Sequence, residues 1–89
     1  MQNKRRRAQI GERAQLSSLR IGQEAKVISL HTQDKALRRR FLDMGITEGV
    51  HLKVKKIAPL GDPVDVELRG YELCIRKLDM AMIEVEVIK

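Results

Sequence analysis

Three side chains in this sequence could ligate a metal ion: His31, His51 and Cys74. Imidazole and thiolate groups bind zinc and other divalent transition metals. No HxH or HxxxH spacing joins the two histidines, so a site would need all three residues to converge in the folded chain. The single cysteine excludes an internal disulfide and a cysteine-based zinc cage. No cofactor is predicted, and weak divalent metal binding in a metal-sensing domain is one alternative function.

The sequence contains no recognisable catalytic set. An enzyme needs a nucleophile, an acid/base pair or a metal with an open coordination position. Gly45, Gly49 and Gly61 each occupy a predicted turn, and none precedes a helix, so no phosphate-binding loop is predicted. The carboxylates occur singly on predicted strands, as on a solvated surface. The sequence therefore predicts a protein that is not an enzyme.

The elements that would position a binding site are clearest around residues 58–63, Ala-Pro-Leu-Gly-Asp-Pro. Apolar and polar residues alternate strictly in 50–55 and again in 64–69, which is typical of two half-buried strands. Two prolines and a glycine between such runs make a turn. We therefore predict a β-hairpin whose rigid loop can present side chains to a partner without first being ordered.

The hairpin also predicts its own register, because a slip by one residue would turn its apolar side chains outward. Opposite charges would then face each other across the strands. The predicted pairs are Val54 with Val66, Lys53 with Glu67, and Lys55 with Asp65.

Three further strands are predicted at 24–30, 71–75 and 83–87. The doublet Val27-Ile28 interrupts the alternation of the first of these, which indicates either a bulge or burial on both faces. Together with the hairpin, these segments predict a mainly β fold, a small antiparallel barrel of about five strands. Closing the sheet would remove its exposed edges.

One short α-helix is predicted at residues 34–44. Thr32 or Asp34 can cap its first amide groups. Its apolar face is formed by Leu37, Phe41 and Met44, with Leu42 widening it. Gly45 supplies the left-handed stop, after which Ile46 folds back on the last turn.

The basic character of the chain is concentrated in residues 1–15, which carry five Lys or Arg side chains and one acidic one. We therefore divide the chain into a basic flexible tail, 1–15, and one domain, 16–89. The tail either remains solvated or contacts anionic lipid or nucleic acid. No apolar run approaches the ~18 residues of a membrane span, and no apolar segment follows the basic residues as in a signal peptide.

A small basic barrel that binds nucleic acid is the second alternative. Phosphate contacts would come from Arg38, Arg39 and Arg40 together with the tail. Bases usually stack on aromatic side chains, however, and the chain offers only Phe41, which is predicted to lie in the core, and Tyr71. The sequence therefore does not favour nucleic acid as the partner.

Several motifs together resemble the FeoA family of small cytoplasmic proteins associated with the ferrous-iron transporter FeoB. The two most specific are the helix stop Met44-Gly45-Ile46 and the turn 58–63. The entry 16–19 and the segment 73–77 also match, and the resemblance covers residues 16–88. The resemblance implies an SH3-like barrel, a binding role in iron transport, and a cytoplasmic location that is peripheral to the membrane through the partner.

The implied partner is the cytoplasmic part of a membrane GTPase of the FeoB type. The hairpin loop and the open face of the helix are the expected contacts. Leu60 points either at the partner or back onto the barrel. Exposed strand edges also allow a homodimer. The candidate partner-binding residues are Arg38, Arg39, Pro59, Leu60, Gly61, Asp62 and Pro63.

Overall fold

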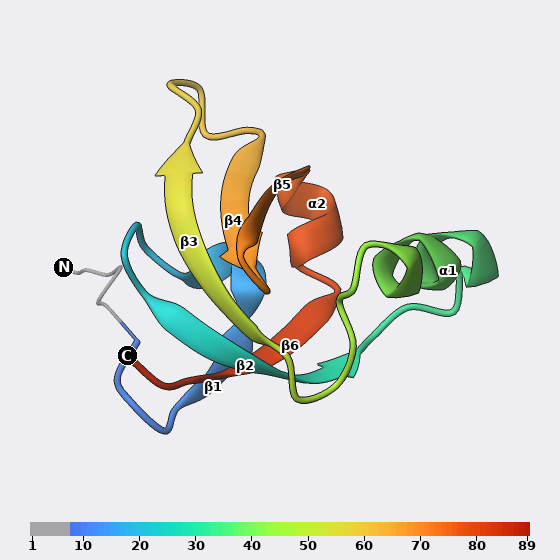
Figure 1. The fold of residues 1–89 in the computed structure, drawn as a ribbon, viewed down its shortest axis with the longest axis horizontal. Helices are drawn as coiled ribbons and strands as arrows, with labels where there is room; N and C mark the ends of the chain where they lie inside the picture. Colours follow the sequence, from blue (N-terminus) through green and yellow to red (C-terminus); the bar gives the residue numbers. More distant parts are fainter. Residues whose placement is uncertain (1–7) are drawn as a thin grey trace, which may run out of the picture.

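The computed structural model describes residues 8–89 as one strongly bent antiparallel sheet with short helices between its strands (Figure 1). The fold is mainly β, as the sequence predicts. None of the helices in residues 8–89 has the length and apolar composition needed to cross a membrane. The elements are β1 (Arg13–Gln15), the 3-10 helix η1 (Leu16–Ser18), β2 (Glu24–Leu30), α1 (Lys35–Asp43), β3 (His51–Ile57), β4 (Val64–Leu68), β5 (Tyr71–Ile75), α2 (Lys77–Met80) and β6 (Ile83–Val87).

The sheet has six strands in the order β1-β6-β2-β3-β4-β5, where five were predicted. Alternate residues of β4 and β6 are buried, so that one face of the sheet forms the core. Leu16 of η1 and Met80 of α2 are also buried and complete this core beyond the strands. The sheet is not closed, because β1 and β5 stand at its two ends without pairing to each other. The prediction of a fully closed sheet is therefore wrong.

The additional strand, β1, lies inside the segment assigned to the tail. Residues 13–15 pair antiparallel with β6, and Ala14 packs against the core. Gly11 continues this edge by donating its amide to the carbonyl of Val87 at 2.7 Å. The boundary predicted at residue 15 is therefore wrong for residues 13–15, since strand pairing uses the backbone and tolerates polar side chains. Residues 8–12 of the predicted tail are also described, with Ala8 packed against the core, whereas residues 1–7 lie outside the described residues.

The predicted helix is confirmed as α1, with Asp34 as its N-cap. The Asp34 carboxylate accepts hydrogen bonds from the amides of Ala36 and Leu37 at 2.9 and 3.2 Å. Phe41 is fully buried, whereas Leu42 is 46% exposed, so Leu42 does not widen the buried face as predicted.

The stop after α1 is a Schellman motif. Gly45 has a φ of +90°, and its amide bonds the carbonyl of Leu42 at 3.0 Å. The amide of Ile46 bonds the carbonyl of Phe41 at 2.8 Å, and the Ile46 side chain is buried. The tyrosine hydroxyl of Tyr71 donates a hydrogen bond to the carbonyl of Met44, which ties the end of α1 to β5.

The hairpin of β3 and β4 has the predicted register in its first half only. Val54 lies opposite Val66 and Lys53 opposite Glu67, but a bulge follows and Asp65 then faces Lys56. The predicted pair of Lys55 with Asp65 is therefore wrong, because the bulge inserts one extra residue in β3. The Lys55 ammonium instead lies 3.8 Å from the carboxylate of Glu67. A bulge is also present at Ile28 of β2, which confirms one of the two predicted alternatives.

Candidate functional site

The hairpin loop 58–63 is held in shape by its own backbone. The amide of Ala58 donates to the carbonyl of Pro63 at 3.1 Å, and the amide of Gly61 donates to the carbonyl of Ala58 at 2.7 Å. Gly61 has a φ of +93°, which a glycine adopts without strain. The Leu60 side chain at the tip is 97% exposed. Of the two alternatives for Leu60, the structure therefore excludes packing back onto the barrel.

Asp62 connects this loop to α2. Its carboxylate accepts a hydrogen bond from the backbone amide of Lys77 at 2.8 Å. The amide of Lys77 is one of the groups that no residue within a helix can satisfy, so Asp62 supplies its partner from another part of the chain. Asp62 was predicted to contact a partner protein, and the structure gives it this internal role. Pro59 and Pro63 are exposed on either side of it.

The sequence reasoning did not identify Leu78 of α2, which is 79% exposed. The segment was predicted as a tight connection between strands, and it forms a helix of four residues. Only Met80 of this helix is buried. In the sequence, the apolar residues Leu78 and Met80 stand on either side of Asp79. Residues two positions apart point to different sides of a helical turn, so only one of the two can face the core.

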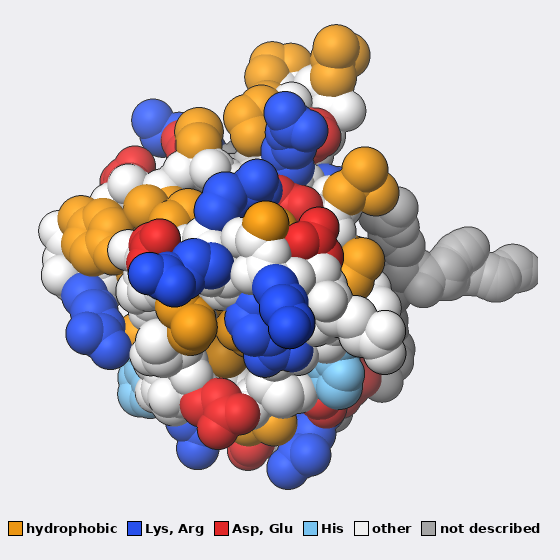
Figure 2. All heavy atoms as spheres, turned by 90° about the vertical axis from the view of Figure 1, so that its right-hand side faces the viewer, with side chains coloured by type: hydrophobic (Ala, Val, Ile, Leu, Met, Phe, Trp, Pro, Cys, Tyr) orange, Lys and Arg blue, Asp and Glu red, His pale blue; other side chains and the backbone are white. Residues whose placement is uncertain are grey.

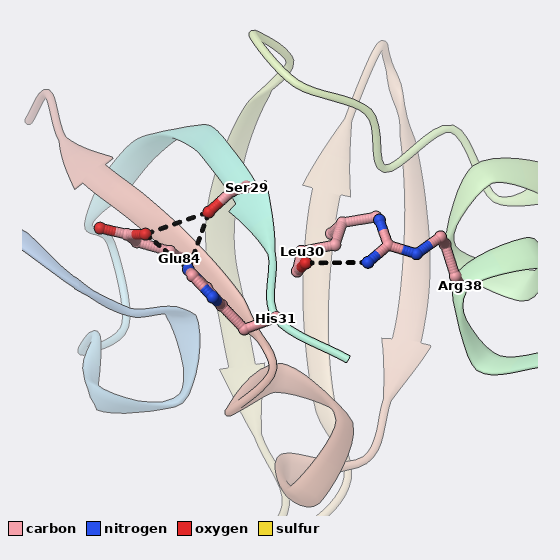
Figure 3. Close-up of polar contacts among 5 residues, drawn as sticks. All are labelled: Ser29, Leu30, His31, Arg38 and Glu84. Atoms are coloured by element: carbon pink, nitrogen blue, oxygen red, sulfur yellow. Dashed lines mark hydrogen bonds and ion pairs between the residues drawn. The ribbon is translucent and has the colours of Figure 1, made fainter. Parts of the chain in front are cut away.

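The two arginines predicted as partner contacts have different environments. The Arg38 guanidinium donates to the backbone carbonyl of Leu30 at 3.2 Å (Figure 3). It also donates to the carbonyl of Thr32 at 2.8 Å. Arg38 therefore ties α1 to the end of β2 while it remains exposed, and its contact with a partner stays a prediction. Arg39 is 78% exposed and lies 3.5 Å from Asp43 on its own helix.

The third arginine of this run, Arg40, forms an ion pair with Asp79 of α2 at 3.3 Å. All three arginines that could bind phosphate groups thus have partners within the protein, and Arg39 has its partner on its own helix. α1 is in this way fixed to β2 by one arginine and to α2 by another.

The structure does not bring the three candidate metal ligands together. His31 follows β2, His51 begins β3 and pairs with Lys26, and Cys74 lies on β5. Across residues 8–89, no cluster of three or more His, Cys, Asp or Glu side chains could hold a metal ion. The convergence that the metal-sensing alternative requires is therefore not found in this part of the chain.

His31 instead belongs to a polar triangle on the surface (Figure 3). Its Nε2 lies 2.7 Å from the Glu84 carboxylate and 2.8 Å from the Ser29 hydroxyl, and that hydroxyl donates to the same carboxylate at 3.0 Å. These hydrogen bonds from His31 and Ser29 lower the pKa of Glu84. Although the residue types match a Ser-His-acid triad, the serine hydroxyl and the carboxylate both contact Nε2 of the histidine. In a catalytic triad, the serine contacts one ring nitrogen and the carboxylate the other, so this cluster does not activate the serine.

Cys74 is exposed, but its environment keeps the thiol protonated. The thiol donates a hydrogen bond to the Asp65 carboxylate on the neighbouring strand at 2.8 Å. This hydrogen bond and the nearby negative charge raise the pKa of Cys74. Because thiolate is the form that binds metals and attacks electrophiles, the structure does not favour either role for this residue.

The bent sheet, with a projecting loop and two surface helices, defines an SH3-like domain. The fold is shared with a solved Stenotrophomonas maltophilia FeoA in complex with zinc, described as a procaryotic SH3 domain protein, at a TM-score of 0.70. The two chains are 23% identical, and the match covers 80% of this chain and 87% of the other. The predicted SH3-like architecture is thereby confirmed.

A family model described as FeoA domain matches residues 14–87, and the chain belongs to the FeoA family. The solution structure of FeoA from Chlorobium tepidum has a TM-score of 0.79 and 38% identity, covering 85% of this chain and 71% of that one. A curated relative from Porphyromonas gingivalis, a fusion of Fe(2+) transport protein A with the Fe(2+) transporter FeoB, is 37% identical over 73 residues. The match covers 82% of this chain but only 8% of that relative.

Proposed function

We propose that this protein is a non-enzymatic accessory of ferrous-iron uptake that binds the cytoplasmic part of FeoB. The observation that carries this proposal is the curated relative, in which a matching segment is fused to FeoB. Two domains that are joined in one protein commonly act together, and separate chains of the same kinds then need an interface. A cytoplasmic location beside the membrane follows from this partner.

The contact that we propose is the hairpin loop with Leu60 at its tip, together with Arg39 of α1. Leu60 exposes almost its whole side chain to water, and the loop around it is fixed by hydrogen bonds. A pre-ordered loop loses little conformational entropy on binding. Arg39 has one exposed intrahelical ion pair to exchange for a partner carboxylate, whereas the Arg38 guanidinium already donates to two backbone carbonyls.

The test is a pulldown of full-length FeoB from the same genome, in detergent, by the full-length protein. We expect the wild type to retain FeoB. Leu60→Asp should weaken binding at least tenfold, since transferring leucine out of water accounts for about that factor. Ile21→Asp is the matched control, because Ile21 is also an exposed aliphatic residue, at 56%, on the turn before β2. Failure of the wild type to retain FeoB would refute the proposal.

A further inference from the structure

Building on the proposed FeoB contact, we infer that loop 58–63 and α2 form one binding face. We call it the loop–α2 face and define it as residues 56–63 and 76–82. Its occupant is a site on the cytoplasmic part of FeoB in which an apolar pocket is bordered by acidic side chains. The inference adds Leu78 and the basic residues beside it to the contact, and it states the chemistry of the partner surface.

Two leucines are the apolar part of the loop–α2 face. Leu60 is 97% exposed and Leu78 79% exposed, the two highest values among the large hydrophobic residues of the described chain. Leu60 stands two positions before Asp62 and Leu78 one position after Lys77, so the leucines flank the hydrogen bond that joins those two residues. A standard interface covers about 800 Å² on each partner, which is enough to include both side chains.

The relative position of the two leucines is fixed. The carboxylate of Asp62 holds the loop to α2 at 2.8 Å, and the ion pair of Arg40 with Asp79 holds α2 to α1 at 3.3 Å. Figure 1 shows the loop projecting above the sheet, with α2 below it on the side that faces α1. The face is therefore preorganised, and a partner can match both leucines at once.

The charges on the loop–α2 face select an acidic partner. Its two carboxylates, Asp62 and Asp79, already accept hydrogen bonds from the backbone amide of Lys77 and from the Arg40 guanidinium. The three basic side chains, Lys56, Arg76 and Lys77, are exposed, and within residues 8–89 no carboxylate forms an ion pair with them. Figure 2 shows basic side chains spread over this side of the molecule, with hydrophobic ones gathered on the projection at the top.

A protein fits this pattern better than an anionic bilayer does. Asp62 lies two residues from the leucine that would have to enter the lipid, and a uniformly negative surface would repel it. A protein surface can instead place individual acidic groups opposite Arg76 and Lys77 and leave Asp62 undisturbed. The occupant is therefore a protein surface of mixed apolar and acidic character.

The experiment measures binding of the full-length protein to FeoB in nanodiscs by biolayer interferometry, with empty nanodiscs of 30% anionic lipid as a separate arm. The variants are Leu78→Asp and Lys77→Glu, because both side chains are exposed and the Lys77 side chain has no hydrogen bond or ion pair with residues 8–89. Their matched controls are Ile21→Asp and Lys89→Glu, which make the same kinds of change outside the face. Far-UV circular dichroism verifies that all four variants are folded.

We expect Leu78→Asp to weaken binding at least tenfold and Lys77→Glu about fivefold at low salt, with both controls within twofold of the wild type. If the wild type binds FeoB and Leu78→Asp binds it as tightly as Ile21→Asp does, the inference is overturned and the proposed function stands. No wild-type binding to FeoB would overturn both. Equal binding to empty anionic nanodiscs would identify the loop–α2 face as a lipid-binding surface, which also contradicts the inference.

Discussion

The glycine that ends α1 allows backbone strain and steric conflict to be measured separately. A Cβ added to Gly45, whose φ is +90°, would lie 2.9 Å from the hydroxyl oxygen of Tyr71. Gly22 has nearly the same φ, +93°, but a Cβ there would meet nothing within 4 Å. Gly22→Ala therefore reports the strain alone, and Gly45→Ala reports the strain and the displacement of Tyr71.

The expected destabilisations follow from these contacts. A left-handed conformation costs an alanine about 1–2 kcal/mol, so Gly22→Ala should lower the free energy of unfolding by that amount. Gly45→Ala should cost about 1 kcal/mol more, because moving Tyr71 breaks its hydrogen bond to the Met44 carbonyl. Tyr71→Phe alone removes the same hydrogen bond and should cost about 1 kcal/mol. In Gly45→Ala that bond is already lost, so adding Tyr71→Phe should cost nothing further.

The assay is urea unfolding of the full-length variants followed by far-UV circular dichroism, since the chain has no tryptophan. The double-mutant cycle of Gly45→Ala with Tyr71→Phe should show a coupling of about 1 kcal/mol, whereas Gly22→Ala with Tyr71→Phe should be additive. Additivity in both cycles, or equal costs for the two glycine substitutions, would refute the steric argument.

Two further predictions concern ionisable groups. Asp65→Ala should lower the pKa of Cys74 and speed the reaction of its thiol with a disulfide reagent at pH 8. At pH 11, where the thiol is ionised in both the variant and the wild type, the two rates should be equal. Equal rates at pH 8 would contradict the prediction. His31→Gln should raise the pKa of Glu84, measured by NMR of its carboxyl carbon, and an unchanged pKa would contradict the proposed cause. Because that pKa is lowered by folding, its contribution to stability is present above the unfolded pKa and disappears as the pH falls through the folded one.

The sequence predicted correctly those features for which the residue types and the pattern of buried positions point to the same structure. The cap at Asp34, the stop at Gly45 and the pairing of Val54 with Val66 are all confirmed. Each depends on residues close in sequence, or on an alternation that only one register satisfies. The bulge after Val54 has no such signal, because one extra residue in a strand leaves the local composition unchanged.

The parts that could not be predicted depend on contacts between distant segments. β1 was missed because its three residues, Arg-Ala-Gln, carry no strand pattern and are held by backbone pairing to β6. The hydrogen bonds of Arg38 were not predicted, because helix periodicity does not show that Leu30, at the end of β2, and Thr32, two residues later, lie within reach of its guanidinium. A turn was correctly predicted between the two strands, but its attachment to α2 through Asp62 is visible only in three dimensions.

The pairing of β1 with β6 has a consequence for how such a domain can be joined to another. It brings the start and the end of the described chain together at one edge of the sheet, on the left of Figure 1, away from the loop and α1. A linker at either end could therefore tether the domain without covering the loop–α2 face. Tethering through a short flexible linker supplies an effective concentration of about millimolar. An interface too weak to hold two separate chains together would then suffice, so a free-standing domain has to bind more tightly than a fused one to reach the same occupancy.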